Sequence, residues 1–367
     1  MQALKDFINR ESIAQLGAAI AAVDPVFPVD RFSADALRGL RRLELKARID
    51  HVAGSLGRHL PPDFPTAAGV VTTAVDDRGL SVWAAWPVTV WISEAGIDHF
   101  EESVALLEHV TATASAEFAV RPFIDKKPGA MKRVLRRWAR SKDPHVRRLA
   151  SEGARPRLPW APRLTATGDD PGWALFILDI LRDDPSESVR KSIANHLNDI
   201  CKLDPDLGLA TAKRWIDAGG THIAWVTRHG LRTLIKRGDP RALALLGVDA
   251  SARVKIEALK LARRRLQVGE PLEFSFRIRN AERSSVVAVI DYAILFVKSN
   301  GSRGRKVFKL KTVELSPGQE LPLSRRFPLR EITTRRYYAG THRLEIQCNG
   351  VVGAAEEFHL AVPAAHR

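Results

Sequence analysis

The 367-residue sequence predicts two domains of different class, an all-α solenoid of helical repeats followed by an all-β sandwich. Apolar residues recur with helical spacing up to about Val248 and with strand spacing after it. All eight tryptophans lie before residue 226, in the first of these parts. We therefore expect a helical domain over residues 1–248, a basic linker over 249–266 and a β domain over 267–367.

The clearest helix of the first domain is expected over Met131–Arg140. Its apolar residues stand at positions i, i+3, i+4 and i+7, namely Met131, Val134, Leu135 and Trp138. The opposite face carries a stripe of basic side chains, Lys132, Arg133, Arg136, Arg137 and Arg140. The same spacing predicts a second helix near Val189–Lys202.

Short motifs recur where these helices begin. The pattern Asp143, Pro144, Val146, Arg147 returns as Asp184, Pro185, Val189, Arg190, with a looser copy at Trp225–Arg228. The three valines are 43 and 37 residues apart, near the roughly 40 to 47 residues of HEAT-type helical repeats. Asp before Pro also suits the start of a helix, where a carboxylate caps the first turn. A HEAT-like stack of helix pairs is therefore expected, with a concave binding face.

The second domain reads as short strands. Apolar and polar residues alternate over Leu272–Ile278, and further strands are expected at Val289–Val297, Val307–Leu315, Thr341–Cys348 and Glu356–Val362. Six or seven short strands in about a hundred residues predict an immunoglobulin-like sandwich. The linker contains three consecutive arginines, Arg263 to Arg265, and a helix over Lys255–Arg265 is one of its alternatives.

Charge is concentrated in Arg121–Arg163. This stretch holds 14 Lys and Arg against three acidic residues, within a chain of net charge +15. The β part, residues 249–367, adds a second excess, with 22 basic and 12 acidic residues. Such clustering favours nucleic acid as the partner, because phosphates bind basic surfaces at any sequence. The alternative is a solvated helix face.

Several other classes of protein are disfavoured. There is no Gly-rich loop followed by Lys and Ser or Thr, no Cys and His cluster with zinc spacing and no nucleophile elbow. No cofactor and no metal are therefore expected. Two distant cysteines, no apolar run of membrane-spanning length and no secretory signal predict a soluble protein of the cytoplasm. We also expect a monomer.

Two carboxylates stand out as candidates for chemistry. Glu117 lies in an otherwise apolar stretch just before the basic block, and Asp199 lies beside two asparagines. A carboxylate in apolar surroundings is costly unless it is paired. The structural alternative for Glu117 is an ion pair with Arg121 or Arg148, and the same doubt applies to Asp199.

Trp160 is the third candidate. It follows Arg155, Arg157 and two prolines, a composition that predicts an ordered loop. An indole there could lie against a sugar or a base, or it could fill a hydrophobic gap under the loop.

Five segments together resemble the AlkC branch of the bacterial DNA alkylation repair glycosylases: Glu117–Phe123, His145–Gly153, Arg155–Trp160, Ala194–Asp199 and Arg228–Leu234. The resemblance covers the helical part strongly, and the β domain matches an immunoglobulin-like module of some members. It implies a HEAT-like repeat enzyme that excises 3-methyladenine and 3-methylcytosine from alkylated duplex DNA without base flipping. The alternative is a non-catalytic DNA-binding or scaffold protein.

The resemblance also implies roles for single residues. Glu117 is the candidate catalytic carboxylate, and Asp199 is a second carboxylate lining the site. Arg148 would hold the phosphate beside the lesion, with Glu152 orienting it from the same helix. Trp160 would pack on the deoxyribose. Further candidates for DNA contacts are Arg155, Arg157, Lys132, Arg136, Arg228 and Arg232.

The β domain would add DNA contacts through loops. The candidates are Lys298, Arg303, Arg305 and Lys306 in one hairpin, or Arg335 and Arg336 near Tyr337 and Tyr338. The alternative is an appended domain with scattered surface charge.

Overall fold

The computed structural model describes residues 3–77, 79–167, 170–330 and 336–362. The chain forms two compact units, Met1–Gly230 and Leu231–Arg367. The division falls before residue 248, so the last two short helices group with the strands. Among the described residues, no helix combines the length and apolarity needed to cross a bilayer.

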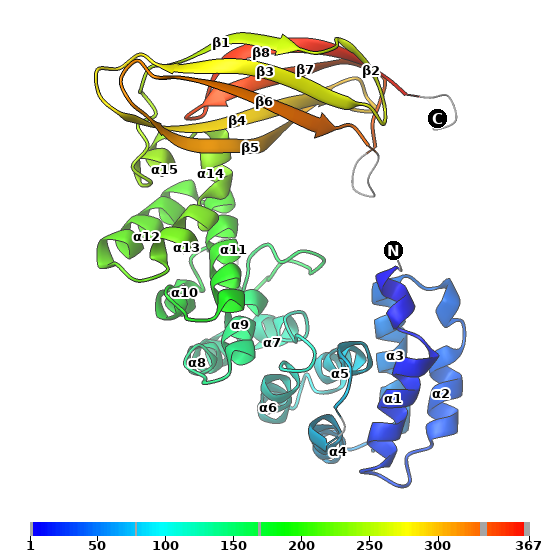
Figure 1. Cartoon of the computed structure of the whole chain (residues 1–367). Coiled ribbons are helices and arrows are strands. Elements are labelled where there is room, and N and C mark those ends of the chain that lie inside the picture. Colours follow the sequence, from blue (N-terminus) through cyan, green and yellow to red (C-terminus); the bar gives the residue numbers. More distant parts are fainter. Residues whose placement is uncertain (1–2, 78, 168–169, 331–335, 363–367) are drawn as a thin grey trace. The chain divides into compact units, whose positions relative to one another are not determined.

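The first unit is helical throughout (Figure 1). Its helices are α1 (Arg10–Ala21), α2 (Val29–Leu37), α3 (Leu45–His59), α4 (Phe64–Asp77), α5 (Val82–Ala95), α6 (Phe100–Val110), α7 (Arg121–Lys126), α8 (Pro128–Trp138), α9 (Pro144–Gly153), α10 (Leu175–Leu181), α11 (Glu187–Leu203), α12 (Pro205–Ala218) and α13 (Ile223–Gly230), with 3-10 turns η1 (Leu4–Phe7) and η2 (Leu40–Arg42). Helix α11 packs against both α9 and α13, as expected of neighbouring repeats.

Sequence periodicity placed the helices α8 and α11 correctly. The four apolar residues predicted to face inward from α8 are all buried. Asp143 caps α9 by accepting a hydrogen bond from the backbone N–H of His145, with Pro144 at the first helical position. Asp184 does not cap α11 as the repeat suggested, because α11 starts after Ser186. Its carboxylate accepts a hydrogen bond from the backbone N–H of Ser186 at 2.8 Å, just before the helix, and two from Arg147 of the preceding repeat, at 2.7 and 3.0 Å.

A second pair of contacts repeats along the unit. The indole of Trp138 in α8 donates to Glu108 of α6, which also binds Arg137. The indole of Trp215 in α12 donates to Asp179 of α10, which also binds Arg214. In both places one carboxylate thus satisfies a buried indole and an arginine, a similarity in addition to the pattern that the sequence indicated.

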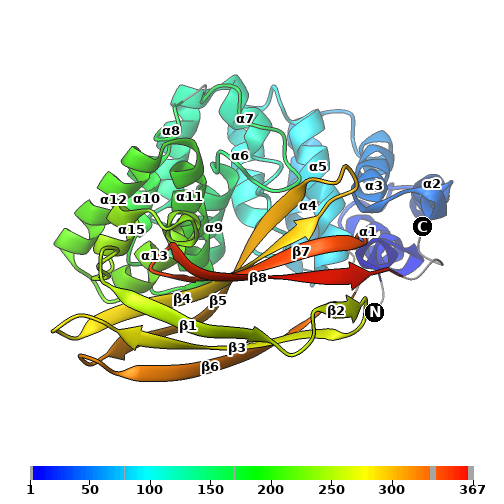
Figure 2. The ribbon, with the colours of Figure 1, turned by 90° about the horizontal axis from the view of Figure 1, so that it is seen from above.

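The second unit is a sandwich of two sheets (Figure 2). Its elements are α14 (Arg232–Arg237), α15 (Pro240–Ala244), β1 (Val254–Leu261), β2 (Arg265–Gln267), β3 (Pro271–Asn280), β4 (Val286–Val297), β5 (Arg303–Leu315), β6 (Glu320–Pro328), β7 (Gly340–Cys348) and β8 (Val351–Ala361). One sheet has the order β1-β3-β6 and the other β2-β8-β7-β4-β5. All pairs are antiparallel except β2 with β8.

The core of the sandwich follows from the alternation in the sequence. In β3, Leu272, Phe274, Phe276 and Ile278 are buried while the residues between them are exposed. They pack with Tyr292 of β4 and with residues of the other strands in one cluster. The predicted alternation is therefore confirmed.

The alternative of a helix over Lys255–Arg265 is wrong. Lys255–Arg265 forms β1 and the first residue of β2, and β1 pairs with β3 with a bulge between Glu257 and Lys260. Ala258, inside the bulge, has a φ of 54°. The alternating burial of β1 shows that a strand covers one side of the sandwich here.

Helices α14 and α15 belong to the second unit because of their packing. Leu243 and Val248 are buried against Val289 of β4. Gly238 and Gly350 approach so closely that a Cβ on either would lie within 2.6 Å of the Cα of the other. Both have positive φ, so only glycine fits without strain.

Candidate active site

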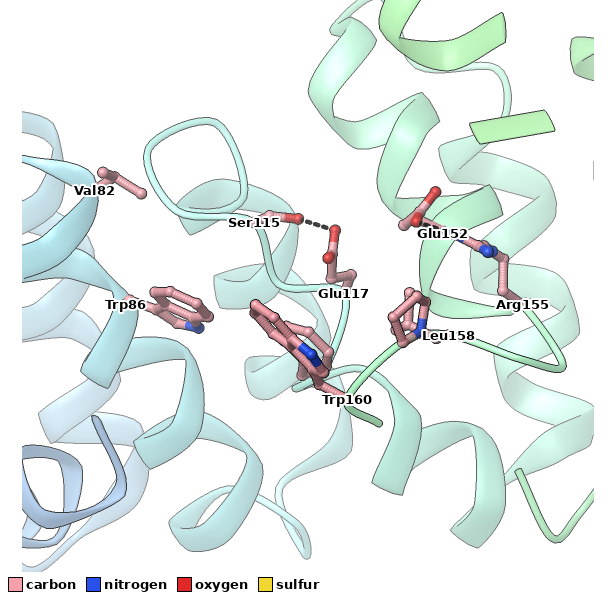
Figure 3. A pocket seen from close by; sticks show the side chains of 10 residues that line it. Val82, Trp86, Ser115, Glu117, Glu152, Arg155, Leu158 and Trp160 are labelled. Atoms are coloured by element: carbon pink, nitrogen blue, oxygen red, sulfur yellow. Dashed lines mark hydrogen bonds and ion pairs between the residues drawn. The ribbon is translucent and has the colours of Figure 1, made fainter. Parts of the chain in front are cut away.

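The first unit contains a cavity of about 370 Å³ between repeats (Figure 3). It is lined by Val82, Trp86, Ser115, Glu117, Phe118, Glu152, Arg155, Leu158, Pro159 and Trp160. These residues come from α5, from the turns between α6 and α7, from the end of α9 and from the segment that follows α9. Four of the predicted site residues, Glu117, Glu152, Arg155 and Trp160, therefore line the same cavity.

Glu117 is partly exposed and is held by two neighbours. The hydroxyl of Ser115 donates to its Oε2 at 2.7 Å, and Arg148 Nη2 lies 2.8 Å from the same oxygen. Arg148 Nη1 also donates to the Ser115 hydroxyl, at 2.9 Å. Glu117 therefore does form an ion pair with Arg148, as expected for a purely structural carboxylate. Unlike such a carboxylate, however, Glu117 lines the cavity. The side chain of Glu117 is 16% exposed, so it remains accessible from the cavity.

Asp199 has very different surroundings. Its side chain is 1% exposed and is not among the described residues that line the cavity. Arg155 binds its Oδ2 through two nitrogens, at 2.9 and 2.8 Å, and Lys202 donates to Oδ1 at 3.1 Å. The structure thus separates Asp199 from the cavity by the guanidinium of Arg155.

Glu152 completes this buried network. It accepts hydrogen bonds from Arg155 Nη1 and from the hydroxyl of Ser192, both at 2.6 Å. Burial disfavours the charge on Arg155, but the carboxylates of Glu152 and Asp199 more than offset it and raise the pKa of Arg155. The expectation that Glu152 orients Arg148 is wrong, because α9 directs Glu152 towards Arg155. Nearby His196 is fully buried, and burial lowers its pKa to about 3.

Trp160 lies in a tight turn at the cavity. Ala161 N–H donates to Leu158 O, with Pro159 and Trp160 between them. Trp160 has a φ of 68°, as residue i+2 of a type II turn requires, a position that usually holds glycine. Its side chain is 73% exposed. The alternative of a hydrophobic plug is therefore wrong.

Sequence reasoning missed the aromatic side of the cavity. Trp86 of α5 lines it, and Phe118 stacks on Trp86 with ring centroids 6.4 Å apart. In Figure 3, Trp86 and Trp160 lie on one side of Glu117 and Leu158 lies on the other. No local motif marks Trp86, because it reads as one apolar residue of the α5 helix. Its neighbour in the cavity, Glu117, is distant in sequence.

The other predicted DNA contacts are dispersed. Lys132 and Arg136 of α8 lie over the rings of Trp173 and Phe176. Arg157 is exposed beside a second hollow of about 430 Å³, which Arg163 also lines. None of these four lines the cavity at Glu117.

The remaining candidates lie on α13 and in the second unit. Arg228 is exposed on α13, and Arg232 is half-buried on α14. On β5, Arg303 pairs with Glu357 and Arg305 with Glu345. Arg335 lies outside the described residues. Arg336 lies over the ring of Tyr338.

Among the described residues, no group of three or more His, Cys, Asp and Glu side chains is placed to hold a metal ion. The cavity instead brings together two carboxylates, Glu117 and Glu152, the guanidinium of Arg155 and two indoles, with Arg148 bound to Glu117. Such a site can bind a phosphate, stabilise a developing positive charge and exclude solvent from an apolar face.

Comparison with known proteins bears on the whole chain. Residues 255–362 match a family model described as uncharacterised protein YhaZ, C-terminal Ig-like domain. The uncharacterised protein YhaZ of Bacillus subtilis is 39% identical over 98% of this chain and all of its own length. The alkylpurine DNA glycosylase AlkC of Pseudomonas fluorescens, solved with DNA containing an abasic-site analogue, matches with a TM-score of 0.93 and 37% identity, over 98% of this chain and all of that one. The chain belongs to the AlkC family.

Membership of the AlkC family confirms the resemblance noted in the five sequence segments and the two-part fold class. The match includes the second unit as well as the helical one, since it covers nearly the whole chain. The immunoglobulin-like sandwich is therefore part of the AlkC-type architecture in this protein.

Proposed function

We propose that this chain is a DNA glycosylase that excises cationic N3-methylated bases, 3-methyladenine and 3-methylcytosine, from duplex DNA without flipping them, and so initiates base excision repair. The solved AlkC structure at 37% identity supports glycosidic bond cleavage. The observation that carries the site is Glu117, an accessible carboxylate beside Arg148 and Trp160 at one cavity.

The chemistry follows from the substrate. A base methylated at a ring nitrogen carries a positive charge, so its glycosidic bond breaks without an added proton. Departure leaves an oxocarbenium-like deoxyribose, which a nearby carboxylate stabilises. One carboxylate therefore suffices. Glu117 takes this role and also positions the attacking water.

Asp199 has a different role in this proposal. Its two hydrogen bonds from Arg155 and its burial make it part of the support beneath the cavity. We propose that Asp199 and Glu152 together fix Arg155, which lines the cavity directly. Loss of either carboxylate would leave a buried arginine incompletely paired.

Arg148 and Trp160 act on the DNA backbone. Arg148 is partly exposed, and its guanidinium suits a phosphate next to the lesion. Trp160 projects its exposed indole beside the cavity and packs on the deoxyribose. Contact with the sugar and phosphate fits an enzyme that leaves the base in the stack.

The decisive variant is Glu117→Gln. The amide keeps the shape of the side chain but loses the charge, so we expect single-turnover release of 3-methyladenine to fall by roughly 100- to 1,000-fold. Binding to DNA with an abasic-site analogue should persist. Both are measured on the same methylated and abasic duplexes.

Glu187→Gln is the matched control, since Glu187 pairs with Lys191 on the exposed surface of α11. It should release base at the wild-type rate. Wild-type release by Glu117→Gln would refute the catalytic assignment, and no release by the wild-type chain would favour the non-catalytic alternative. Retained stacking of the lesion is checked with 2-aminopurine placed opposite or beside it.

A further inference from the structure

We propose that α7 holds the Trp160 loop, residues 154–163, in the conformation that presents its indole at the cavity, with Arg121 and Asp125 as positioning residues. The expected effect of these residues on base release rests on the proposed function. Their expected effect on the conformation of the loop does not. Neither residue lines the cavity at Glu117. Both act through the backbone of the segment that carries Trp160.

Arg121 binds both ends of the loop. Its Nη1 donates to Gly153 O at 2.8 Å and to Arg155 O at 2.9 Å, and its Nη2 donates to Pro162 O at 2.8 Å. The first two carbonyls lie where α9 ends, and the third lies two residues beyond Trp160. One guanidinium therefore fixes the distance between the two ends of the loop.

Asp125, one turn further along α7, holds the chain that leaves the loop. Its Oδ1 accepts hydrogen bonds from the backbone N–H groups of Thr165 and Ala166, at 2.7 and 2.8 Å. Leu158 and Leu164 are buried on either side of the turn. The loop is thus fixed at its start, at its end and just after it, while Trp160 between these points is exposed.

The conformation that these contacts hold is not one that Trp160 favours. A non-glycine residue with positive φ is disfavoured and persists only where the surroundings determine it. The turn itself has one backbone hydrogen bond, from Ala161 to Leu158. The contacts from α7 supply the further constraint.

Arg121 is a costly way to achieve ordinary packing. The residue is buried, and no carboxylate forms a salt bridge with it among the described residues. Burial lowers its pKa to about 10. An apolar residue would fill the space without burying a charge. The planar guanidinium of Arg121 donates to three carbonyls at once. Neither an apolar residue nor lysine could make all three hydrogen bonds.

The test compares Arg121→Lys with Arg48→Lys. Arg48 is a control of the same kind, because it is also buried and donates to backbone carbonyls, those of Leu43 and Lys5. It does not line the cavity, although it also lies 3.7 Å from Asp6. Both variants lose hydrogen bonds and should lower the melting temperature. Only Arg121→Lys should alter Trp160.

The direct measurement is ¹⁹F NMR of full-length protein labelled with 5-fluorotryptophan, with the Trp160 resonance assigned by Trp160→Phe. Arg121→Lys should shift or broaden that resonance, and Arg48→Lys should leave it in place. Single-turnover base release should fall roughly 10- to 100-fold in Arg121→Lys, as misplaced contacts typically cost, with little change in binding to undamaged DNA. In a Trp160→Ala background, Arg121→Lys should have little further effect on that rate.

Asp125→Ala gives a second route if Arg121→Lys does not fold, since Asp125 is only half-buried. It should move the same resonance. An unchanged Trp160 resonance in the folded variants, or full additivity with Trp160→Ala, would overturn the inference. If the wild-type chain releases no base, the proposed function fails, while the resonance still decides the role of α7.

Discussion

At the scale of single residues, Trp160 shows how a local conformation and an exposed side chain combine. Its positive φ is a strain of about 1 kcal/mol or more for a side chain with a Cβ. Its exposure means that little apolar burial compensates for that strain. A residue that is strained and exposed at a cavity contributes to function more than to stability.

Because of this strain, Trp160→Gly and Trp160→Ala should differ. Glycine removes the strain and alanine keeps it, so we expect the glycine variant to be the more stable of the two by about 1 kcal/mol. Both lose the indole and should release base at least tenfold more slowly than wild type, an estimate within the usual range for a lost positioning contact. Thermal melts and single-turnover rates measure the two effects. Equal activity in all three proteins would remove Trp160 from the site.

The two carboxylates differ at the same scale. Glu117 and Asp199 both stand out in the sequence, but Glu117 reaches the cavity while Asp199 is covered by Arg155. The difference arises because Asp199 lies on α11, which packs against α9, and Arg155, just after the end of α9, covers its carboxylate. Glu117 lies instead in a turn, where the backbone places its side chain at the edge of the repeats.

At the scale of elements, the end of α9 must lie very close to the turn that carries Glu117. A Cβ on Gly153 would lie 2.3 Å from Val120 Cγ1, and Val120 is fully buried. The Gly153 carbonyl also accepts the hydrogen bond from Arg121. Gly153 therefore sets the distance between α9, the Trp160 loop and the Glu117 turn.

Gly153→Ala should separate these elements. We expect a loss of about 1 to 3 kcal/mol in the free energy of unfolding, as overpacking usually costs, together with slower base release. Gly69→Ala is the matched control in α4, because its Cβ would meet nothing within 4 Å. It should leave release unchanged and raise stability by up to about 1 kcal/mol. Chemical denaturation and release assays on both variants test this, and a neutral Gly153→Ala would contradict the close approach.

At the scale of the whole molecule, positive charge is present in both units. The first contains the basic block Arg121–Arg163 and the second carries arginines on β5. Arg303 and Arg305 are each paired with a glutamate but remain about one-third exposed. Paired arginines on a surface can exchange a carboxylate for a phosphate at small cost, because exposed ion pairs are weak.

Removing both arginines of β5 tests whether the second unit binds DNA. If each contacts one phosphate, the double variant Arg303→Ala, Arg305→Ala should reduce the slope of log affinity against log salt by about 2. Arg277→Ala is the control, since Arg277 pairs with Glu320 on the other sheet. Fluorescence anisotropy with a duplex measures the slope. An unchanged slope would leave the first unit as the whole DNA-binding surface.

Local patterns in the amino-acid sequence were enough to predict the two classes of domain, the helices α8 and α11, the strands of the sandwich and the positive charge. Periodicity and composition are local properties, so they can be read from neighbouring residues. Two predictions that proved wrong also came from local patterns. Lys255–Arg265 lacks a strong period and became a strand through pairing with β3. Helix α11 begins after Ser186, so Asp184 lies ahead of it and binds Arg147 of another repeat as well as the Ser186 N–H.

The tertiary structure decided which candidate residues share a site. Glu117, Trp86 and Trp160 meet at one cavity although dozens of residues separate them. Glu152 and Arg155 line the same cavity, while Asp199 lies outside its lining and pairs with Arg155. It also decided that Trp160 is exposed in a strained turn and that Arg121 binds the loop carrying it. These are properties of packing between repeats. Residue types and local spacing do not specify which side chains will be enclosed and which will remain at a surface.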